Sequence, residues 1–300
     1  MGQRILIAGA SGLIGTALSR ELEIQQNQVF KLSRSLENSA PNSFYWEPKR
    51  QLIDLDDARP FDCLINLSGS NIGKKRWTNR EKELIWNSRI QSALFLCKNI
   101  NRLLKPSGTF INASAIGFYG NRGEEVLDEE SSPGEGFLAK LSQAWESSLS
   151  IAVNSGFRVL MTRFGIVLSE KGGALANMLP LFYLGLGGPL GSGTQYMSWI
   201  SLDDICKAII HCLNTHSLQG AINVVAPNLV TNAEFARTLG KFIHRPVFLK
   251  VPSFILKIIF SEMAEETILT STRAYPKKLL ESSFSFEHPT LEDAFRQIFS

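Results

Sequence analysis

Three glycines near the start of the chain have a spacing suited to binding a phosphate group. They lie in the stretch Gly9-Ala10-Ser11-Gly12-Leu13-Ile14-Gly15. The first glycine permits a tight turn, a middle one lets the backbone approach a pyrophosphate, and the last lets a helix pack on a strand. The spacing is one residue longer than in the standard G-x-G-x-x-G fingerprint. The match therefore lies in the job of each glycine and not in the exact spacing. It predicts a dinucleotide held at a helix N-terminus, where unpaired N–H groups and the helix dipole favour anions.

The segments on either side of this loop have the order that such a site requires. Arg4–Ala8 is short and mostly apolar, as in a strand that is buried on both faces of a parallel sheet. Thr16–Leu22 has helical periodicity, and Val29–Ser33 predicts a second strand. Together they form a βαβ unit of about thirty residues. The alternative is a chance cluster of glycines, but a chance cluster has no reason to lie between a strand and a helix.

The end of the second predicted strand indicates which dinucleotide is bound. An NAD site commonly places Asp or Glu there, where the carboxylate accepts hydrogen bonds from the ribose hydroxyls. This chain has Lys31-Leu32-Ser33-Arg34-Ser35 instead, with no acidic residue before Glu37. Because a guanidinium pairs well with a phosphate, Arg34 suits the 2′-phosphate of NADP. We therefore predict that NADP(H) is preferred over NAD(H); the alternative is that Arg34 is an ordinary solvated surface residue.

Strand-like and helix-like segments alternate further along the chain. Residues 63–67, 109–113 and 158–163 are strand-like, whereas 79–104 and 139–153 have helical periodicity, the former as one long or two consecutive helices. This order predicts an α/β fold, a Rossmann-like doubly wound parallel sheet with right-handed crossovers. We assign residues 1–226 to an NAD(P)-binding domain with a glycine-rich cap insertion near 171–194. Residues 227–300 are expected to form a smaller, mainly helical C-terminal lobe that covers the substrate.

Composition excludes several classes of protein. The 300 residues are 44% hydrophobic and 20% charged, with 31 Lys and Arg against 28 Asp and Glu. These values are typical of a globular protein, and the excess of +3 is too small to indicate a nucleic-acid or membrane-surface partner. No apolar run approaches the roughly 18 residues that a bilayer span needs. We expect a small-molecule substrate, and we leave a homodimer open.

Cysteine and histidine usage gives a location and argues against a metal. The cysteines form no C-x-x-C pair and lie in or beside apolar runs, at Cys63, Cys97, Cys206 and Cys212. Buried free thiols fit a reducing cytoplasm, and the first residues do not resemble a signal peptide, so we expect a cytoplasmic protein. The four histidines have no ligand spacing, and no metal site is predicted.

Taken together, these motifs resemble the short-chain dehydrogenase/reductase superfamily in its extended, epimerase-like branch. Within that branch the chain is similar to the atypical subgroup known as epimerase family proteins, or SulA-like nucleoside-diphosphate-sugar epimerases. The motifs that carry the resemblance span the whole chain: Asn66–Gly69, Arg76–Thr78, Ser88–Ile90, Ser114–Gly120, Trp199–Ile205 and Pro276–Leu279.

The resemblance implies roles for individual residues. Gly9, Ser11, Gly12, Leu13 and Ile14 would line the pyrophosphate. Ser33 and Arg34 would hold the adenosine phosphate, and Leu67, Ser68 and Gly69 would pass near the adenine and the ribose.

The same superfamily uses a Tyr-x-x-x-Lys pair for proton transfer, and this pair is missing here. Alignment on Glu146 places Leu138 at the tyrosine and Ser142 at the lysine, and neither can act as an acid or base near neutral pH. Ser114 remains as the residue expected to hold the substrate oxygen. Tyr119 with Lys140 is a candidate substitute pair; the alternative is that Tyr119 packs in the core and Lys140 is solvated.

Two functions of different classes follow from these residues. The first is an NADP(H)-dependent oxidoreductase or epimerase-like enzyme with an atypical active site and an unidentified substrate. The second is a non-catalytic NADPH-binding regulatory or sensor module, which the missing pair favours.

Overall fold

A parallel β-sheet forms the centre of the structure, which is a computed structural model describing residues 2–35, 42–55, 60–73 and 75–300. The eight strands have the order β12-β8-β6-β5-β1-β2-β3-β4, and neighbours are parallel except the pair β3 and β4. In chain order they are β1 (Arg4–Ala8), β2 (Gln28–Ser33), β3 (Ser43–Glu47), β4 (Leu52–Ile53), β5 (Phe61–Asn66), β6 (Leu104–Ala115), β8 (Arg158–Phe164) and β12 (Gly220–Val224). The strand order reverses between β1 and β5, as in a doubly wound fold. The predicted fold class is confirmed.

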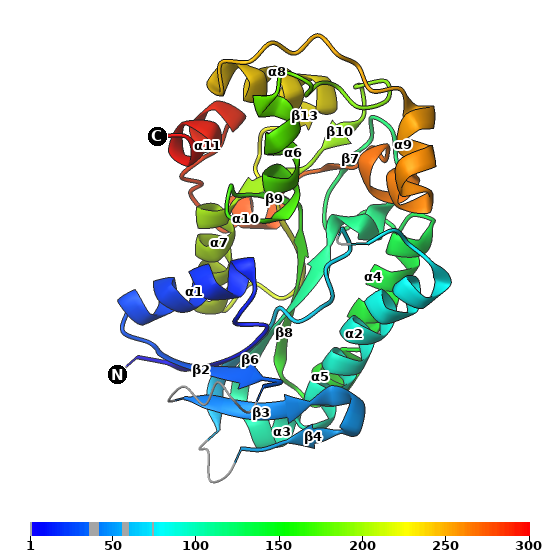
Figure 1. Cartoon of the computed structure of the whole chain (residues 1–300). Helices are drawn as coiled ribbons and strands as arrows, with labels where there is room; N and C mark the ends of the chain where they lie inside the picture. Colours follow the sequence, from blue (N-terminus) through cyan, green and yellow to red (C-terminus); the bar gives the residue numbers. More distant parts are fainter. Residues whose placement is uncertain (1, 36–41, 56–59, 74) are drawn as a thin grey trace.

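Helices cover both faces of this sheet (Figure 1). One face carries α1 (Leu13–Ile24) and α7 (Leu202–Asn214); the other carries α2 (Asn79–Lys98), α3 (Ile100–Leu103), α4 (Phe137–Ser147) and α5 (Ser150–Asn154). Ile5 and Ile7 pack toward α1 and α7, whereas Leu6 and Ala8 pack toward α2 and α4. Because side chains of a strand alternate between faces, burial on both sides explains the apolar run that predicted β1.

A smaller lobe lies at one end of the sheet (Figure 1). Its helices are α6 (Gly173–Tyr183), α8 (Asn232–Phe242), α9 (Ser253–Phe260), α10 (Lys277–Glu281) and α11 (Leu291–Ile298), with a π-helical turn at Ala264–Ile268. Short strands accompany them: β7 (Val126–Leu127), β9 (Ile166–Leu168), β10 (Tyr196–Met197), β11 (Trp199–Ser201), β13 (Val230–Thr231) and β14 (Arg273–Ala274). Leu175, Phe235 and Phe295 form part of one core that joins α6, α8 and α11. The prediction of a mainly helical C-terminal region is confirmed.

The glycine-rich stretch near 171–194 contains a helix as well as loops. α6 follows Gly172 directly and includes Pro180. Its sequence between the glycines is apolar, and Leu175, Leu179 and Phe182 are buried against α8 and α11. Tertiary packing therefore stabilises a helix here, although the glycine content of the stretch did not indicate one.

The C-terminal segment is fixed to the sheet domain through a buried carboxylate. Asp204, in the first turn of α7, is fully buried and accepts hydrogen bonds from the backbone amides of Glu287 (2.8 Å) and His288 (3.0 Å).

None of the helices in the described part of the chain is both long and apolar enough to cross a bilayer.

Candidate functional site

The loop between β1 and α1 has the geometry of a phosphate-binding turn. Gly9 has φ +82°, and a Cβ atom there would lie 2.7 Å from the carbonyl carbon of Leu67. A Cβ atom at Gly15 would lie 2.2 Å from the Gly9 carbonyl oxygen, so a helix can pack here only on a glycine. At Gly12, by contrast, an added Cβ would meet only the Gly9 oxygen, at 3.4 Å. Gly9 and Gly15 thus close the turn, while Gly12 leaves its backbone open to a ligand.

The helix that follows begins with amide groups that need a partner. Gly12 is the N-cap of α1, with φ −76°, and no side chain caps the helix within the described residues. Ser11 and Gly12 are exposed, and Leu13 and Ile14 are partly buried. Since the first amides of a helix have no acceptor inside it, those of α1 point their N–H groups toward any anion placed in the loop.

The loop after β5 lies beside the Gly9–Gly15 loop. Asn66 is fully buried; its Nδ2 donates to Asn112 Oδ1 at 2.7 Å, and its Oδ1 accepts from the Ser68 amide at 3.2 Å. The Leu67 amide donates to the Ala8 carbonyl oxygen at 2.8 Å. These bonds fix Leu67–Gly69 beside the glycine loop. The structure thus brings together two of the segments that were expected to bind the coenzyme.

Ser33 and Arg34 lie at the carboxyl end of β2, next to β1. Arg34 is exposed, while Ser33 Oγ accepts the Ser35 amide at 3.2 Å. Glu37, the first acidic residue after this strand, lies outside the described residues. The start of α6 also reaches the loop, because a Cβ atom at Gly172 would lie 3.7 Å from the Leu13 side chain.

Ser114 lies at the carboxyl end of β6, where it is buried together with an ion pair. Its hydroxyl donates to Glu146 Oε1 at 2.7 Å. Arg163 of β8 holds the same carboxylate at both oxygens, with Nε–Oε1 and Nη2–Oε2 distances of 2.8 Å. The side chains of Arg163 and Glu146 are only 5% and 10% exposed. Because the single hydroxyl proton of Ser114 is engaged by Glu146, this arrangement leaves Ser114 only acceptor capacity toward a substrate.

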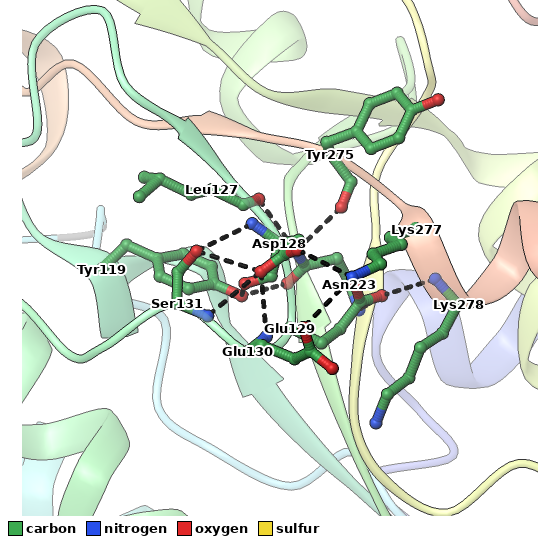
Figure 2. A network of polar contacts seen from close by, with 10 residues as sticks. All are labelled: Tyr119, Leu127, Asp128, Glu129, Glu130, Ser131, Asn223, Tyr275, Lys277 and Lys278. Carbon is green, nitrogen blue, oxygen red and sulfur yellow. Dashed lines mark hydrogen bonds and ion pairs between the residues drawn. The ribbon is translucent and has the colours of Figure 1, made fainter.

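Tyr119 is fully buried in a polar network (Figure 2). Its hydroxyl lies 2.7 Å from Asn223 Oδ1 and 2.8 Å from the Asp128 carbonyl oxygen, and it accepts a hydrogen bond from Arg163 Nη1 at 2.9 Å. Burial raises the pKa of the phenol to about 12. Lys140 is exposed on α4, so the structure does not place it with Tyr119. These contacts favour the packing role for Tyr119 over proton transfer.

Figure 2 also shows how this network ties the C-terminal lobe to the sheet. Glu129 Oε1 accepts from the Asn223 amide (3.0 Å) and from the Lys278 amide (3.3 Å). Lys277 Nζ forms ion pairs with Asp128 and with a second acidic residue, Glu130. Burial raises the pKa of the Glu129 carboxyl, whose Oε2 has no partner among the described residues. The Pro276–Leu279 motif is therefore an anchor between the two parts of the chain.

Helix α4 carries no acid–base group at Leu138 and Ser142, the two positions that align with the Tyr-x-x-x-Lys pair. Leu138 packs on the 3-10 turn after β6, since a Cβ atom at Gly117 would lie 3.2 Å from Leu138 Cβ. Ser142 is buried. Glu266 of the C-terminal lobe caps this helix by accepting the amides of Phe137 (3.0 Å) and Leu138 (3.1 Å). The helix is thus firmly held but lacks the usual pair.

The Arg76–Thr78 motif divides into an exposed and a structural part. Trp77 is buried, donates from Nε1 to the Ile72 carbonyl oxygen at 2.8 Å, and lies edge-on to Phe137. Thr78 is the N-cap of α2. Arg76 is exposed.

Among the described residues, one group of potential metal ligands lies close together. Ligand atoms of Asp203, Glu287 and His288 lie within 4.8 Å of one another. Glu287 is paired with Lys207, and His288 Nδ1 lies 3.1 Å from the Ser201 hydroxyl. These partners account for the cluster, and we assign no metal to it.

Comparison with known proteins identifies the family. Residues 5–225 match the NAD dependent epimerase/dehydratase family. The chain belongs to that family. Residues 251–298 match a second family, DUF1731, which is described as a domain of unknown function.

Relatives within the family are similar along the whole chain. The epimerase family protein ML0860 of Mycobacterium leprae is 39% identical over 97% of this chain and 94% of its own. A crystal structure of the human epimerase family protein SDR39U1 with NADPH has a TM-score of 0.88 at 30% identity, covering 98% of both chains. A nucleoside-diphosphate sugar epimerase from Corynebacterium glutamicum has a TM-score of 0.81 at 32% identity, with this chain spanning 58% of its length. The resemblance that the motifs indicated is confirmed, and the chain is an NAD(P)-binding member of the epimerase family.

Sequence reasoning missed the ion pair that surrounds Ser114. Arg163 ends an apolar strand, and Glu146 lies on a helix, so neither stood out as a site residue. A charged residue at the end of a buried strand is itself a signal, because a buried charge requires a partner. Asn223, the partner of Tyr119, gave no such signal.

Proposed function

We propose that this chain binds NADP(H), in preference to NAD(H), in the crevice between the Gly9–Gly15 loop and Leu67–Gly69. The observation that carries the proposal is the open backbone at Gly12, flanked by two glycines that tolerate no side chain. Gly9, Ser11, Gly12, Leu13 and Ile14 would hold the pyrophosphate through main-chain amides. A nicotinamide coenzyme, when bound, supplies or accepts a hydride.

Arg34 supports the choice of the phosphorylated coenzyme. It is exposed at the carboxyl end of β2. The two described residues that directly follow this strand, Arg34 and Ser35, carry no carboxylate. Ser33 and Arg34 would hold the 2′-phosphate, with Arg34 as the charged partner. The human relative, whose crystal structure contains NADPH, is consistent with this choice.

We expect the Arg34→Ala variant to bind NADPH about tenfold more weakly and NADH with unchanged affinity, since one charge-assisted contact is lost. Calorimetric titration of both coenzymes measures the two constants. Arg20→Ala, which removes an exposed arginine from α1, is the matched control and should change neither. Equal affinity of the unaltered protein for NADPH and NADH would contradict the proposal.

The reaction that the site supports best is oxidoreduction or epimerisation of an unidentified small molecule beside Ser114. A non-catalytic NADPH-binding regulatory module is the second candidate. It is favoured because α4 carries Leu138 and Ser142 where the superfamily has its tyrosine and lysine. It is also favoured because the Ser114 hydroxyl already donates to Glu146. Mass spectrometry of the purified protein separates the two: a trapped metabolite together with coenzyme supports an enzyme. Coenzyme alone, without turnover across a carbonyl panel, supports the module.

A further inference from the structure

Most of the large apolar side chains that are exposed in the described part of the chain lie in two segments, residues 181–186 and 248–259. Phe248 and Leu184 are the most open, at 88% and 72% exposed. Single apolar residues scattered over a surface are ordinary, whereas a contiguous exposed group marks a binding surface. The group, which we call the apolar patch, comprises Leu181, Tyr183, Leu184, Leu186, Phe248, Leu249, Phe254, Ile255, Ile258 and Ile259.

Hydrogen bonds hold the two segments side by side. Arg245 Nε donates to the Tyr183 carbonyl oxygen at 2.8 Å, and the Val251 amide donates to the Pro189 carbonyl oxygen at 2.9 Å. Figure 1 shows the connection from α8 to α9, and α9 itself, along the edge of the C-terminal lobe that lies opposite β2 and β3. The two segments therefore contribute to one surface at the outer end of the lobe.

Helix α9 uses only one stripe of its surface for packing inside the protein. Its eight residues, Ser253–Phe260, include a single charged residue, Lys257. Leu256 is buried, and Phe260 packs in the same cluster as Met263. A helix that is apolar around its whole circumference is normally enclosed by protein or by lipid. The outward face of α9 is exposed to solvent, so its burial requires a partner outside the chain.

The charges beside the apolar patch have one sign. Residues 171–202 and 235–261 contain no Asp or Glu, although the whole chain has 28 acidic against 31 basic residues. Lys241, Arg245 and Lys250 are exposed, and none of them forms an ion pair within the described residues. The small net charge of the chain, which gave no indication of a membrane-surface partner, conceals this local asymmetry.

The acidic residues that follow α9 do not balance these cations. Glu262 pairs with Lys82 of α2 at 2.8 Å, and Glu266 accepts the first amides of α4. Glu265 pairs with Lys257 at 2.7 Å. The patch thus combines exposed apolar side chains with unpaired basic ones.

We propose that the apolar patch docks the protein on an anionic membrane surface. Phe254 and Ile258 of α9 enter the boundary between headgroups and acyl chains, while Arg245 and Lys250 face the lipid phosphates. An apolar helical face flanked by Lys and Arg binds in this way because apolar burial and attraction to anionic headgroups act together. The docking is peripheral, since α9 is far shorter than the roughly 20 residues that span a bilayer.

The basic charges favour a membrane over a second copy of the chain. A symmetric dimer places the same patch on both sides of the interface. It would therefore bring Lys241, Arg245 and Lys250 of one copy close to the same residues of the other, and like charges across an interface repel. An anionic lipid surface supplies the opposite charge and the apolar medium at once.

Flotation of the protein with lipid vesicles tests the apolar part of the proposal. Vesicles of equal parts phosphatidylglycerol and phosphatidylcholine should bind it, and vesicles of phosphatidylcholine alone about tenfold more weakly. The double variant Phe254→Ser with Ile258→Ser should bind the anionic vesicles about 100-fold more weakly. Its melting temperature should not change, because these side chains are 61% and 68% exposed. Val153→Ser, which replaces an exposed apolar residue of α5, is the matched control and should bind as the unaltered protein does.

A charge variant tests the electrostatic part. Lys250→Glu should weaken binding to the anionic vesicles about tenfold, because an attraction becomes a repulsion. Lys98→Glu reverses an exposed charge at the end of α2 and should leave binding unchanged. Raising the salt concentration should reduce the difference between Lys250→Glu and the unaltered protein, since it screens exposed charges.

Several results would overturn the proposal. They are no binding of the unaltered protein to anionic vesicles, equal binding to both kinds of vesicle, or a loss in Val153→Ser as large as in the double variant. A dimer in sedimentation that the double variant dissociates, without vesicle binding, would assign the patch to a second copy instead. If the double variant does not fold, Lys250→Glu decides: a tenfold loss supports membrane docking, and unchanged binding overturns it. None of these results depends on whether the chain binds a coenzyme.

Discussion

Replacement of Arg163 by methionine is expected to lower the free energy of unfolding by about 3–5 kcal/mol. The variant leaves the Glu146 carboxylate, which is only 10% exposed, with the Ser114 hydroxyl as its remaining described partner. It also removes the stacking of the guanidinium on Phe118, whose ring centre lies 3.5 Å from Arg163 Cζ. Urea unfolding measured at constant pH gives the difference between variant and unaltered protein.

Two controls make this result specific to an uncompensated buried charge. Lys207→Met breaks an exposed pair with Glu287, and it should cost less than about 1 kcal/mol. The double variant Arg163→Met with Glu146→Leu should recover part of the loss, because it removes the stranded carboxylate. A loss in Arg163→Met no larger than that in Lys207→Met would show that the pair does not stabilise the fold.

The Gly12→Ala variant is expected to bind NADPH about 100-fold more weakly while keeping its stability. The backbone at Gly12 has φ −76°, which alanine adopts freely, and a methyl group there meets only the Gly9 oxygen at 3.4 Å. The methyl group would instead occupy space needed by the pyrophosphate. Loss of two hydrogen bonds to charged oxygens, at about 1.5 kcal/mol each, corresponds to about two orders of magnitude in affinity.

Stability and binding must be measured together for this variant. The melting temperature without ligand should match that of the unaltered protein, whereas Gly15→Ala should lower it, because its methyl group would lie 2.2 Å from the Gly9 oxygen. Full NADPH affinity in Gly12→Ala would mean that no ligand group approaches this turn.

The parts of the fold that depend on local sequence were predictable. Two reasons for glycine in the turn after β1 are local: the φ of +82° at Gly9, and the Gly9 oxygen that would lie 2.2 Å from a Cβ atom at Gly15. β1 is apolar because both of its faces are covered. Thr78 is the N-cap of α2, where its hydroxyl accepts the Glu81 amide, three residues ahead, at 3.2 Å; threonine is one of the residue types that commonly cap helices.

What could not be predicted depends on contacts between distant segments. Tyr119 meets Asn223, which is 104 positions away, and only the packing of β12 beside β8 brings them together. The helical state of α6 likewise requires α8 and α11, which lie later in the chain. Glycine content and residue type alone left both of these open.

A crystal structure of the protein grown with saturating NADPH tests the central claim most directly. The account predicts pyrophosphate oxygens within hydrogen-bonding distance of the amides that begin α1, and the 2′-phosphate beside Arg34. A crevice that stays empty or is filled by side chains, with NADPH elsewhere or absent, would contradict it.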